Sequence, residues 1–162
     1  PCTGLRFFTV YGPWGRPDMA PMIFAKSILS GKPINVFNFG KMKRDFTYID
    51  DVVEGVYRCC YKPAYVDKDF DALMPNPASS FAPSRIFNIG NSHPTPLLKF
   101  IETLEDELGH KAIKNLLPIQ PGDVESTAAN TDLLEKWIDF KPFTSIETGI
   151  SKFAKWYIDY YK

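Results

Sequence analysis

Tyrosine and histidine are among the residues that can carry proton-transfer chemistry, and this chain contains eight tyrosines and two histidines. A tyrosine can act as a base when a lysine four positions later lowers its pKa, so that the phenolate accepts a proton. No tyrosine here is followed by lysine at that spacing. His93 lies in a polar loop and His110 follows Gly109, where imidazole more often contacts solvent or terminal carbonyl groups than performs catalysis. We therefore predict no catalytic residue in this chain.

Glycines could hold a dinucleotide where they join a strand to a helix, because the backbone can then approach a pyrophosphate. Gly12 and Gly15 follow a strand-like run, but a proline and a tryptophan separate them and no third glycine follows in register. The three cysteines, of which Cys59 and Cys60 are adjacent, match neither a zinc spacing nor a disulfide framework. The sequence predicts no cofactor fingerprint and no metal site.

The composition describes a folded chain without a dominant charge. Nineteen basic residues balance nineteen acidic ones, so no overall field draws the chain to nucleic acid or to anionic lipid. Any anionic ligand must be held by individually placed residues. No apolar run approaches the ~20 residues that span a bilayer, and the N-terminus has no signal pattern. With the cysteine pattern, this predicts a cytoplasmic location.

Alternating strand and helix patterns predict an α/β fold. The periodicity and the turn residues predict strands over residues 5–11, 33–39, 45–49, 85–90 and 113–117, and helices after Asp18, Asp50, Thr95 and Thr131 and from a capping box at 144–147. The proline-rich, polar stretch 62–84 predicts a surface loop.

The length of 162 residues suits one domain, and we treat residues 1–162 as a single unit. The sequence enters a strand-like run almost at once, after Pro1-Cys2-Thr3-Gly4. This beginning is typical of the middle of a protein, so we expect an upstream region.

Four runs resemble one family in the same order. They are LRFFTVYGPWGRPDMA from Leu5, KRDFTYIDD from Lys43, FNIGN from Phe87 and QPGDV from Gln120. The first is similar to the segment after the catalytic tyrosine in sugar epimerases of the extended short-chain dehydrogenase type, especially UDP-glucuronate 4-epimerases. The resemblance covers the whole chain, which corresponds to the carboxyl-terminal half of such an enzyme.

The resemblance implies the substrate-binding part of an extended short-chain dehydrogenase, with strands that complete the edge of a Rossmann sheet lying upstream. In that family the N-terminal half binds NAD and supplies the catalytic Ser/Thr, Tyr and Lys, and this half binds the UDP-sugar. The implied reaction passes hydride from sugar C4 to NAD and returns it to the opposite face of a 4-keto sugar. The parent is expected to be a homodimer through the upstream half, and the isolated chain is expected to be inactive.

Three site residues follow from the first run. By resemblance, Thr9 contacts the hexose and can bond a C6 carboxylate, Arg16 is a charge partner for that carboxylate, and Phe8 packs on the nicotinamide ring. A guanidinium suits a carboxylate geometrically. Thr9 could instead satisfy backbone groups at a strand end, and Arg16 could be an exposed loop arginine.

The nucleotide-binding residues come from the other runs. Arg44 resembles the arginine that neutralises the pyrophosphate, and Asp123 resembles the acid that bonds the ribose hydroxyls, although it could merely cap its turn. Gln120 stands where many relatives use arginine for the phosphate. The expected uracil-recognition strip consists of Asn35, Val36 and Phe37, of which Phe37 could equally be a core residue.

Other functions remain open at this point. Nucleotide-sugar dehydratases and UDP-glucuronate decarboxylases share the scaffold and differ in catalytic residues that this chain does not contain. A non-catalytic nucleotide-sugar binding module is a second alternative, and a protein-interaction platform built on the aromatic residues is a third.

Overall fold

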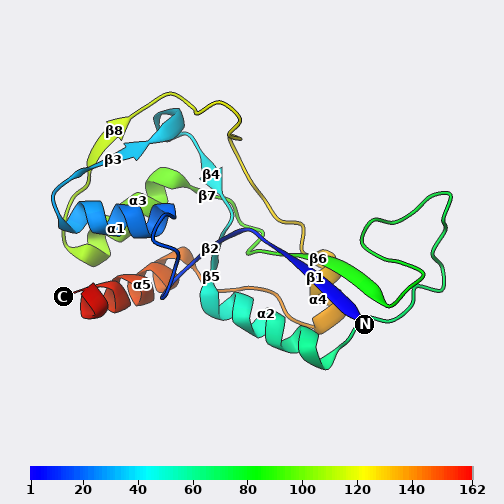
Figure 1. Ribbon diagram of the computed structural model, residues 1–162. Helices are drawn as coiled ribbons and strands as arrows, with labels where there is room; N and C mark the ends of the chain where they lie inside the picture. Colours follow the sequence, from blue (N-terminus) through cyan, green and yellow to red (C-terminus); the bar gives the residue numbers. More distant parts are fainter. Residues whose placement is uncertain (162) are drawn as a thin grey trace.

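The computed structural model describes residues 1–161, which form two lobes joined by a short strand pair (Figure 1). The elements in chain order are β1 (Cys2–Phe7), β2 (Thr9–Tyr11), α1 (Ala20–Leu29), β3 (Pro33–Val36), the turn η1 (Phe37–Gly40), β4 (Lys43–Arg44), β5 (Phe46–Tyr48), α2 (Ile49–Tyr61), β6 (Ser84–Ile89), β7 (Thr95–Pro96), α3 (Leu97–Leu108), β8 (Ile113–Leu116), α4 (Asp132–Ile138) and α5 (Ile146–Tyr161). The described strands pair two by two. The predicted α/β class is therefore confirmed, with small sheets in place of one broad sheet.

The first lobe, which we call the sheet lobe, contains β1, β6, α2 and α4. Strands β1 and β6 run parallel in an unbroken register, from Cys2 opposite Ser84 to Phe7 opposite Ile89. The alternation of β6 places Phe87 and Ile89 in the core, as expected for a strand with one covered face. The core is completed by residues of the two helices, namely Val52, Cys59, Leu134 and Ile138.

The second lobe, the helical lobe, is built from α1, α3, α5 and the β3–β8 pair, which Figure 1 shows on the opposite side of the molecule. Helix α3 supplies its centre, because Phe100, Ile101 and Leu104 are fully buried. Their three- and four-residue spacing places them on one helix face. The helix ends at Leu108, and its C-cap residue Gly109 has a φ of 69°, the left-handed conformation that glycine adopts most easily.

The short parallel pair β2–β5 lies between the lobes. The predicted strand 5–11 is divided at Phe8, because β1 pairs with β6 whereas β2 pairs with β5. The N–H of Phe8 donates to the carbonyl of Ile89 at 3.2 Å, which holds the chain where it changes partner. Residues before Phe8 therefore pair within the sheet lobe, and residues after it pair with β5 between the lobes.

The predicted strand 33–39 is wrong at its end. It stops at Val36, and Asn38 and Phe39 adopt left-handed conformations with φ of 49° and 50°. The N–H of Phe39 donates to the carbonyl of Leu117 at 2.9 Å, so contact with the chain beyond β8 turns η1 out of the strand. Helix starts differ as well: α2 begins at Ile49, so Asp50 lies in its first turn, and α1 begins after Met19 without a cap from Asp18.

Candidate functional site

Arg44 lies in β4, the short strand that pairs antiparallel with β7. Its guanidinium Nη1 donates to the carbonyl of Lys43 at 2.9 Å and to that of Glu125 at 3.2 Å, and its Nη2 donates to Oδ1 of Asp123 at 2.8 Å. The side chain is 17% exposed. Arg44 is therefore a fixed cation at the surface of the helical lobe, and it joins β4 to a segment about eighty residues later in the chain.

Asp123 is oriented by this contact. Its Oδ1 accepts both from Arg44 and from the N–H of Val124, each at 2.8 Å. The turn that presents it is closed by the N–H of Asp123 donating to the carbonyl of Gln120 at 3.1 Å. Within the described chain, both bonds of the carboxylate fall on Oδ1. The second oxygen thus remains an acceptor for hydroxyl groups, so the structure brings together two of the predicted nucleotide-binding residues and places Gln120 at the start of the same turn.

The predicted uracil strip lies where β3 pairs with β8. Asn35 is exposed and its Oδ1 accepts from Nδ2 of Asn115 at 3.0 Å. Val36 is fully buried and its carbonyl accepts from the N–H of Leu117. Phe37 is half-buried against the helical-lobe core. Asn35 therefore offers the accessible polar side chain of this strip, while Phe37 packs against the core and still has an exposed part.

Arg16 is occupied by a neighbour. Its Nε and Nη2 donate to the two carboxylate oxygens of Asp18 at 3.1 and 2.5 Å, and both side chains are largely exposed. The hydrogen bond to Asp18 raises the pKa of Arg16, and the same bond lowers the pKa of Asp18. Thr9 lies half-buried in β2, opposite Phe46. Arg16 therefore bonds Asp18 and not Thr9. Its Nη1 group does not take part in the contact with Asp18.

Gly12 and Gly90 do not form a dinucleotide cradle. A side chain added at Gly12 would collide with Ile49, and one at Gly90 would lie 3.1 Å from Oδ2 of Asp45. Because chain atoms close both positions, these glycines serve internal packing and leave no room for a pyrophosphate. Phe8, half-buried beside Gly90, could form one apolar wall of a nicotinamide site.

Asp45 was missed as a site residue by the sequence prediction, which treated it as the start of a strand. Its carboxylate is fully buried and accepts three backbone N–H groups, from Asn91, Ser92 and Ala129. The sequence gives no clear signal for this, because Asp45 directly follows Lys43 and Arg44 of a polar loop. A buried carboxylate is costly unless it is hydrogen-bonded, and its donors come from much later segments of the chain.

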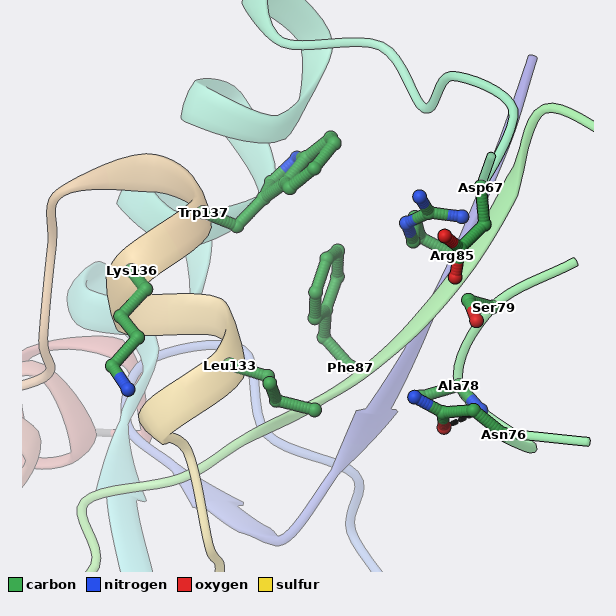
Figure 2. A pocket seen from close by; sticks show the side chains of 9 residues that line it. All are labelled: Asp67, Asn76, Ala78, Ser79, Arg85, Phe87, Leu133, Lys136 and Trp137. Carbon is green, nitrogen blue, oxygen red and sulfur yellow. Dashed lines mark hydrogen bonds between the residues drawn. The ribbon is translucent and has the colours of Figure 1, made fainter. Parts of the chain in front are cut away.

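A cavity of about 250 Å³, separate from the residues described so far, lies in the sheet lobe between β6, α4 and the loop 62–83 (Figure 2). Phe87 of β6 and Trp137 of α4 face it from one side, and Asn76 and Ser79 of the loop 62–83 face it from the other. It lies toward the amino-terminal end of the parallel pair, whereas ligands of open α/β sheets bind beyond the carboxyl ends of the strands. None of the predicted site residues lines it.

No described helix has both the length and the apolar character needed to cross a membrane. No group of three His, Cys, Asp or Glu side chains within residues 1–161 is arranged to hold a metal ion.

Comparison with known proteins gives the family. Residues 1–90, more than half of the chain, match the family model described as the NAD dependent epimerase/dehydratase family. The chain belongs to that family. The match includes β1, β2, Arg16, Arg44 and Asp45, and it ends just after β6.

The relatives within this epimerase/dehydratase family are longer than the chain. Protein CapI of Staphylococcus aureus is 53% identical over all 162 residues, which span 48% of its length. A probable UDP-glucuronate 4-epimerase of Rhizobium meliloti is 46% identical, again with the whole chain spanning 48% of the relative. The chain thus spans about half the length of the curated relatives that it matches.

A solved structure agrees with the sequence comparison. The UDP-glucuronic acid 4-epimerase of Bacillus cereus, in complex with UDP-glucuronic acid and NAD, superposes with a TM-score of 0.77 at 31% identity. The match covers 96% of this chain and 44% of that one. The mixed α/β fold described above is therefore that of extended short-chain dehydrogenase epimerases, over about half of their length.

Proposed function

We propose that this chain forms the UDP-sugar-binding part of an NAD-dependent UDP-sugar 4-epimerase, with UDP-glucuronate as the substrate. The observation that carries the proposal is the contact between Arg44 and Asp123, which joins a cation and an acceptor from two distant segments at one surface. The similarity to a UDP-glucuronic acid 4-epimerase with UDP-glucuronic acid and NAD bound supports this choice.

The pair can hold two adjacent parts of a nucleoside diphosphate, its pyrophosphate and its ribose. A pyrophosphate beside Arg44 gains charge-assisted hydrogen bonds, each contributing about 1.5–3 kcal/mol. Arg44 keeps Oδ1 of Asp123 in place, so the other carboxylate oxygen can accept ribose hydroxyl groups. Asn35 and the backbone near Phe37 would meet the uracil ring, and Gln120 would lie beside the phosphates.

Sugar recognition is assigned to Arg16 and Thr9. Asp18 uses the Nε and Nη2 edge of Arg16, which leaves the Nη1 group for the C6 carboxylate of a uronate. The hydroxyl group of Thr9 would give that carboxylate a second partner. A neutral hexose has no carboxylate, so this pair would favour UDP-glucuronate over UDP-glucose.

NAD and the catalytic groups are assigned to residues outside this chain. When bound, NAD would accept hydride from the sugar and return it during the epimerisation, and the described residues would offer it one apolar wall, at Phe8. The parent protein is proposed to be a cytoplasmic homodimer, which remains a prediction.

Calorimetric titration of the chain with UDP, UDP-glucuronate and UDP-glucose tests the proposal. We expect UDP binding that Arg44→Ala weakens at least tenfold, which corresponds to about 1.4 kcal/mol, and a preference for UDP-glucuronate that Arg16→Ala removes. Arg58→Ala is the matched control, since Arg58 also bonds a carboxylate and two backbone carbonyl groups, but in the sheet lobe. Equal losses in the Arg44 and Arg58 variants would reject the assignment of Arg44.

The reaction type needs a separate test, because the family includes dehydratases as well as epimerases. Products should be analysed with a protein that contains this chain and a complete NAD-binding region. Conversion of UDP-glucuronate to its C4 epimer supports the proposal. Loss of water or of carbon dioxide would identify a dehydratase or a decarboxylase instead, and a nucleotide-sugar binding module would release no product.

A further inference from the structure

The buried carboxylate of Asp45 connects three parts of the chain. Its Oδ1 accepts from the N–H of Asn91 at 3.0 Å, and its Oδ2 accepts from the N–H groups of Ser92 at 3.0 Å and Ala129 at 2.8 Å. Asn91 and Ser92 follow β6, whereas Ala129 belongs to the segment that leads into α4. A buried carboxylate is costly unless hydrogen bonds satisfy it, so this position is built to receive those three main-chain donors.

Asp45 also ends a row of hydrogen bonds between residues 43–45 and the later segment. The N–H of Lys43 donates to the carbonyl of Glu125 at 2.9 Å, and the N–H of Thr127 donates to the carbonyl of Lys43 at 3.2 Å. The N–H of Asp45 donates to Oγ1 of Thr127 at 3.3 Å, and the next contact along the row is the bond from Ala129 to the carboxylate. We call this row the 43–129 zipper.

Arg44 and Asp123 lie at the opposite end of the zipper from Ala129. Between them, the carbonyl of Glu125 accepts from both the N–H of Lys43 and Nη1 of Arg44. A shift of the later segment along residues 43–45 would therefore move Asp123 away from Arg44. Asp45 opposes such a shift, because its carboxylate fixes the segment at Ala129 and ties both strands of the zipper to the end of β6.

We propose that Asp45 is a positioning residue for nucleoside diphosphate binding, which acts by holding Asp123 in register with Arg44. This inference rests on the proposed function, because it assigns the ligand of Arg44 and Asp123 to that class. Asp45 itself is enclosed by the chain and does not touch the ligand.

A second buried carboxylate provides the control. Asp51 is 5% exposed, and its Oδ2 accepts from the N–H groups of Phe143 at 3.2 Å and Thr144 at 2.9 Å. It ties α2 to the chain before α5, away from the zipper. Asp51→Asn thus changes the same chemistry in the same kind of environment without affecting the register of Asp123.

The experiment compares Asp45→Asn with Asp51→Asn by calorimetric titration with UDP and by amide hydrogen exchange. The amide nitrogen of the introduced asparagine would face a backbone donor, so we expect Asp45→Asn to weaken UDP binding about tenfold, or about 1.4 kcal/mol, and to speed exchange at residues 123–129. Asp51→Asn should lower the midpoint of thermal unfolding and leave both UDP affinity and that exchange unchanged. In the Arg44→Ala background, Asp45→Asn should weaken binding less than it does alone.

The outcomes separate this inference from the function on which it rests. UDP binding that is equal in the wild-type chain and Asp45→Asn, or that falls equally in both asparagine variants, would overturn the inference while leaving the function intact. If the wild-type chain binds no UDP, the proposed function fails, and unchanged exchange at residues 123–129 in Asp45→Asn would overturn the positioning role as well. Should Asp45→Asn not fold, Thr127→Val removes one zipper bond and is expected to give a smaller loss of affinity in the same direction.

Discussion

At the residue scale, Tyr11 packs closely against Gly149, although this contact leaves the buried hydroxyl of Tyr11 without a hydrogen bond. The Tyr11 side chain is 3% exposed, and its hydroxyl has no hydrogen-bond partner within the described chain. Burial raises the pKa of this phenol above its ordinary value, so the group stays neutral. A Cβ on Gly149 of α5 would collide with the hydroxyl. The contact fixes how closely α5 can approach β2.

Removal of that hydroxyl should change what position 149 tolerates. We expect Gly149→Ala to lower the free energy of unfolding by about 1–3 kcal/mol, because it overfills a packed contact. Tyr11→Phe should cost less than about 1 kcal/mol, since no bond inside the chain is lost. In the double variant the alanine should be better tolerated than in the single one, as measured by urea denaturation. Additive effects of the two substitutions would contradict the contact as described.

The residues of the candidate site differ in how far the sequence predicts them. Arg44 and Asp123 were named through resemblance, and their spacing of seventy-nine residues carries no sign of contact. The burial of Asp45 could not be read from the sequence, because its three donors are main-chain groups of two later segments. The Arg16–Asp18 pair is local, but an aspartate before a helix suits a capping role equally well, so the sequence pattern does not distinguish the two roles.

At the element scale, Glu105 fastens α3 to β8, the strand that pairs with the predicted uracil strip. Burial opposes its ionisation, but hydrogen bonds from Lys114, from the N–H of Ala112 and from Lys111 outweigh this, so the pKa of Glu105 lies below its ordinary value of 4.5. The carboxylate is 3% exposed and pairs with both lysines. Its ionised form is therefore part of the folded arrangement.

This lowered pKa makes the contribution of Glu105 depend on pH. A carboxylate with a lower pKa in the folded state stabilises the fold above its unfolded pKa, and this stabilisation is lost as the pH falls through the folded pKa. We expect Glu105→Gln to lower the free energy of unfolding by about 1–3 kcal/mol at neutral pH. The difference from wild type should shrink as the pH falls from about 5 to 2. Glu102→Gln, on the exposed face of α3, should show no such trend; a constant deficit in Glu105→Gln would contradict the charge-based account.

The helices were predicted better than the strands. The apolar residues from Leu97 to Leu108 share one helix face and predict α3, and Gly109 predicts its end. Strand partners were not predictable, because β1 with β6 and β3 with β8 are pairs separated by about eighty residues. The alternation that continues through Phe39 predicts a strand across η1, whereas the hydrogen bond to Leu117 turns the chain there.

At the scale of the whole molecule, the two lobes meet through β2–β5 and through Asp45. The geometry of the candidate site therefore depends on how the lobes are positioned relative to each other. Arg44 belongs to the helical-lobe side, and the residues that fix Asp45 follow β6 of the sheet lobe. A ligand that bridges Arg44 and Asp123 would bind two segments whose register is set at this junction.

We therefore expect UDP to slow hydrogen exchange at the end of β6 as well as at residues 123–129.

The sheet lobe also exposes a strand edge. In the described chain β1 pairs on one side with β6, and Phe7 at its end is 55% exposed. A parallel pair of two strands with a free edge is prone to join another copy, because unpaired N–H and C=O groups accept a further strand. We expect the isolated chain to associate at micromolar concentration, as measured by sedimentation velocity.

Phe7→Lys should shift this equilibrium toward the monomer, because a charged side chain on an edge strand opposes pairing. Phe143→Lys is the matched control, since Phe143 is 79% exposed and precedes α5 in a segment outside the strands. If association depends on the free edge of β1, the Phe7 variant sediments as a monomer and the Phe143 variant behaves as wild type. Equal effects of the two lysines would mean that general apolar exposure, and not the strand edge, drives the contact between copies.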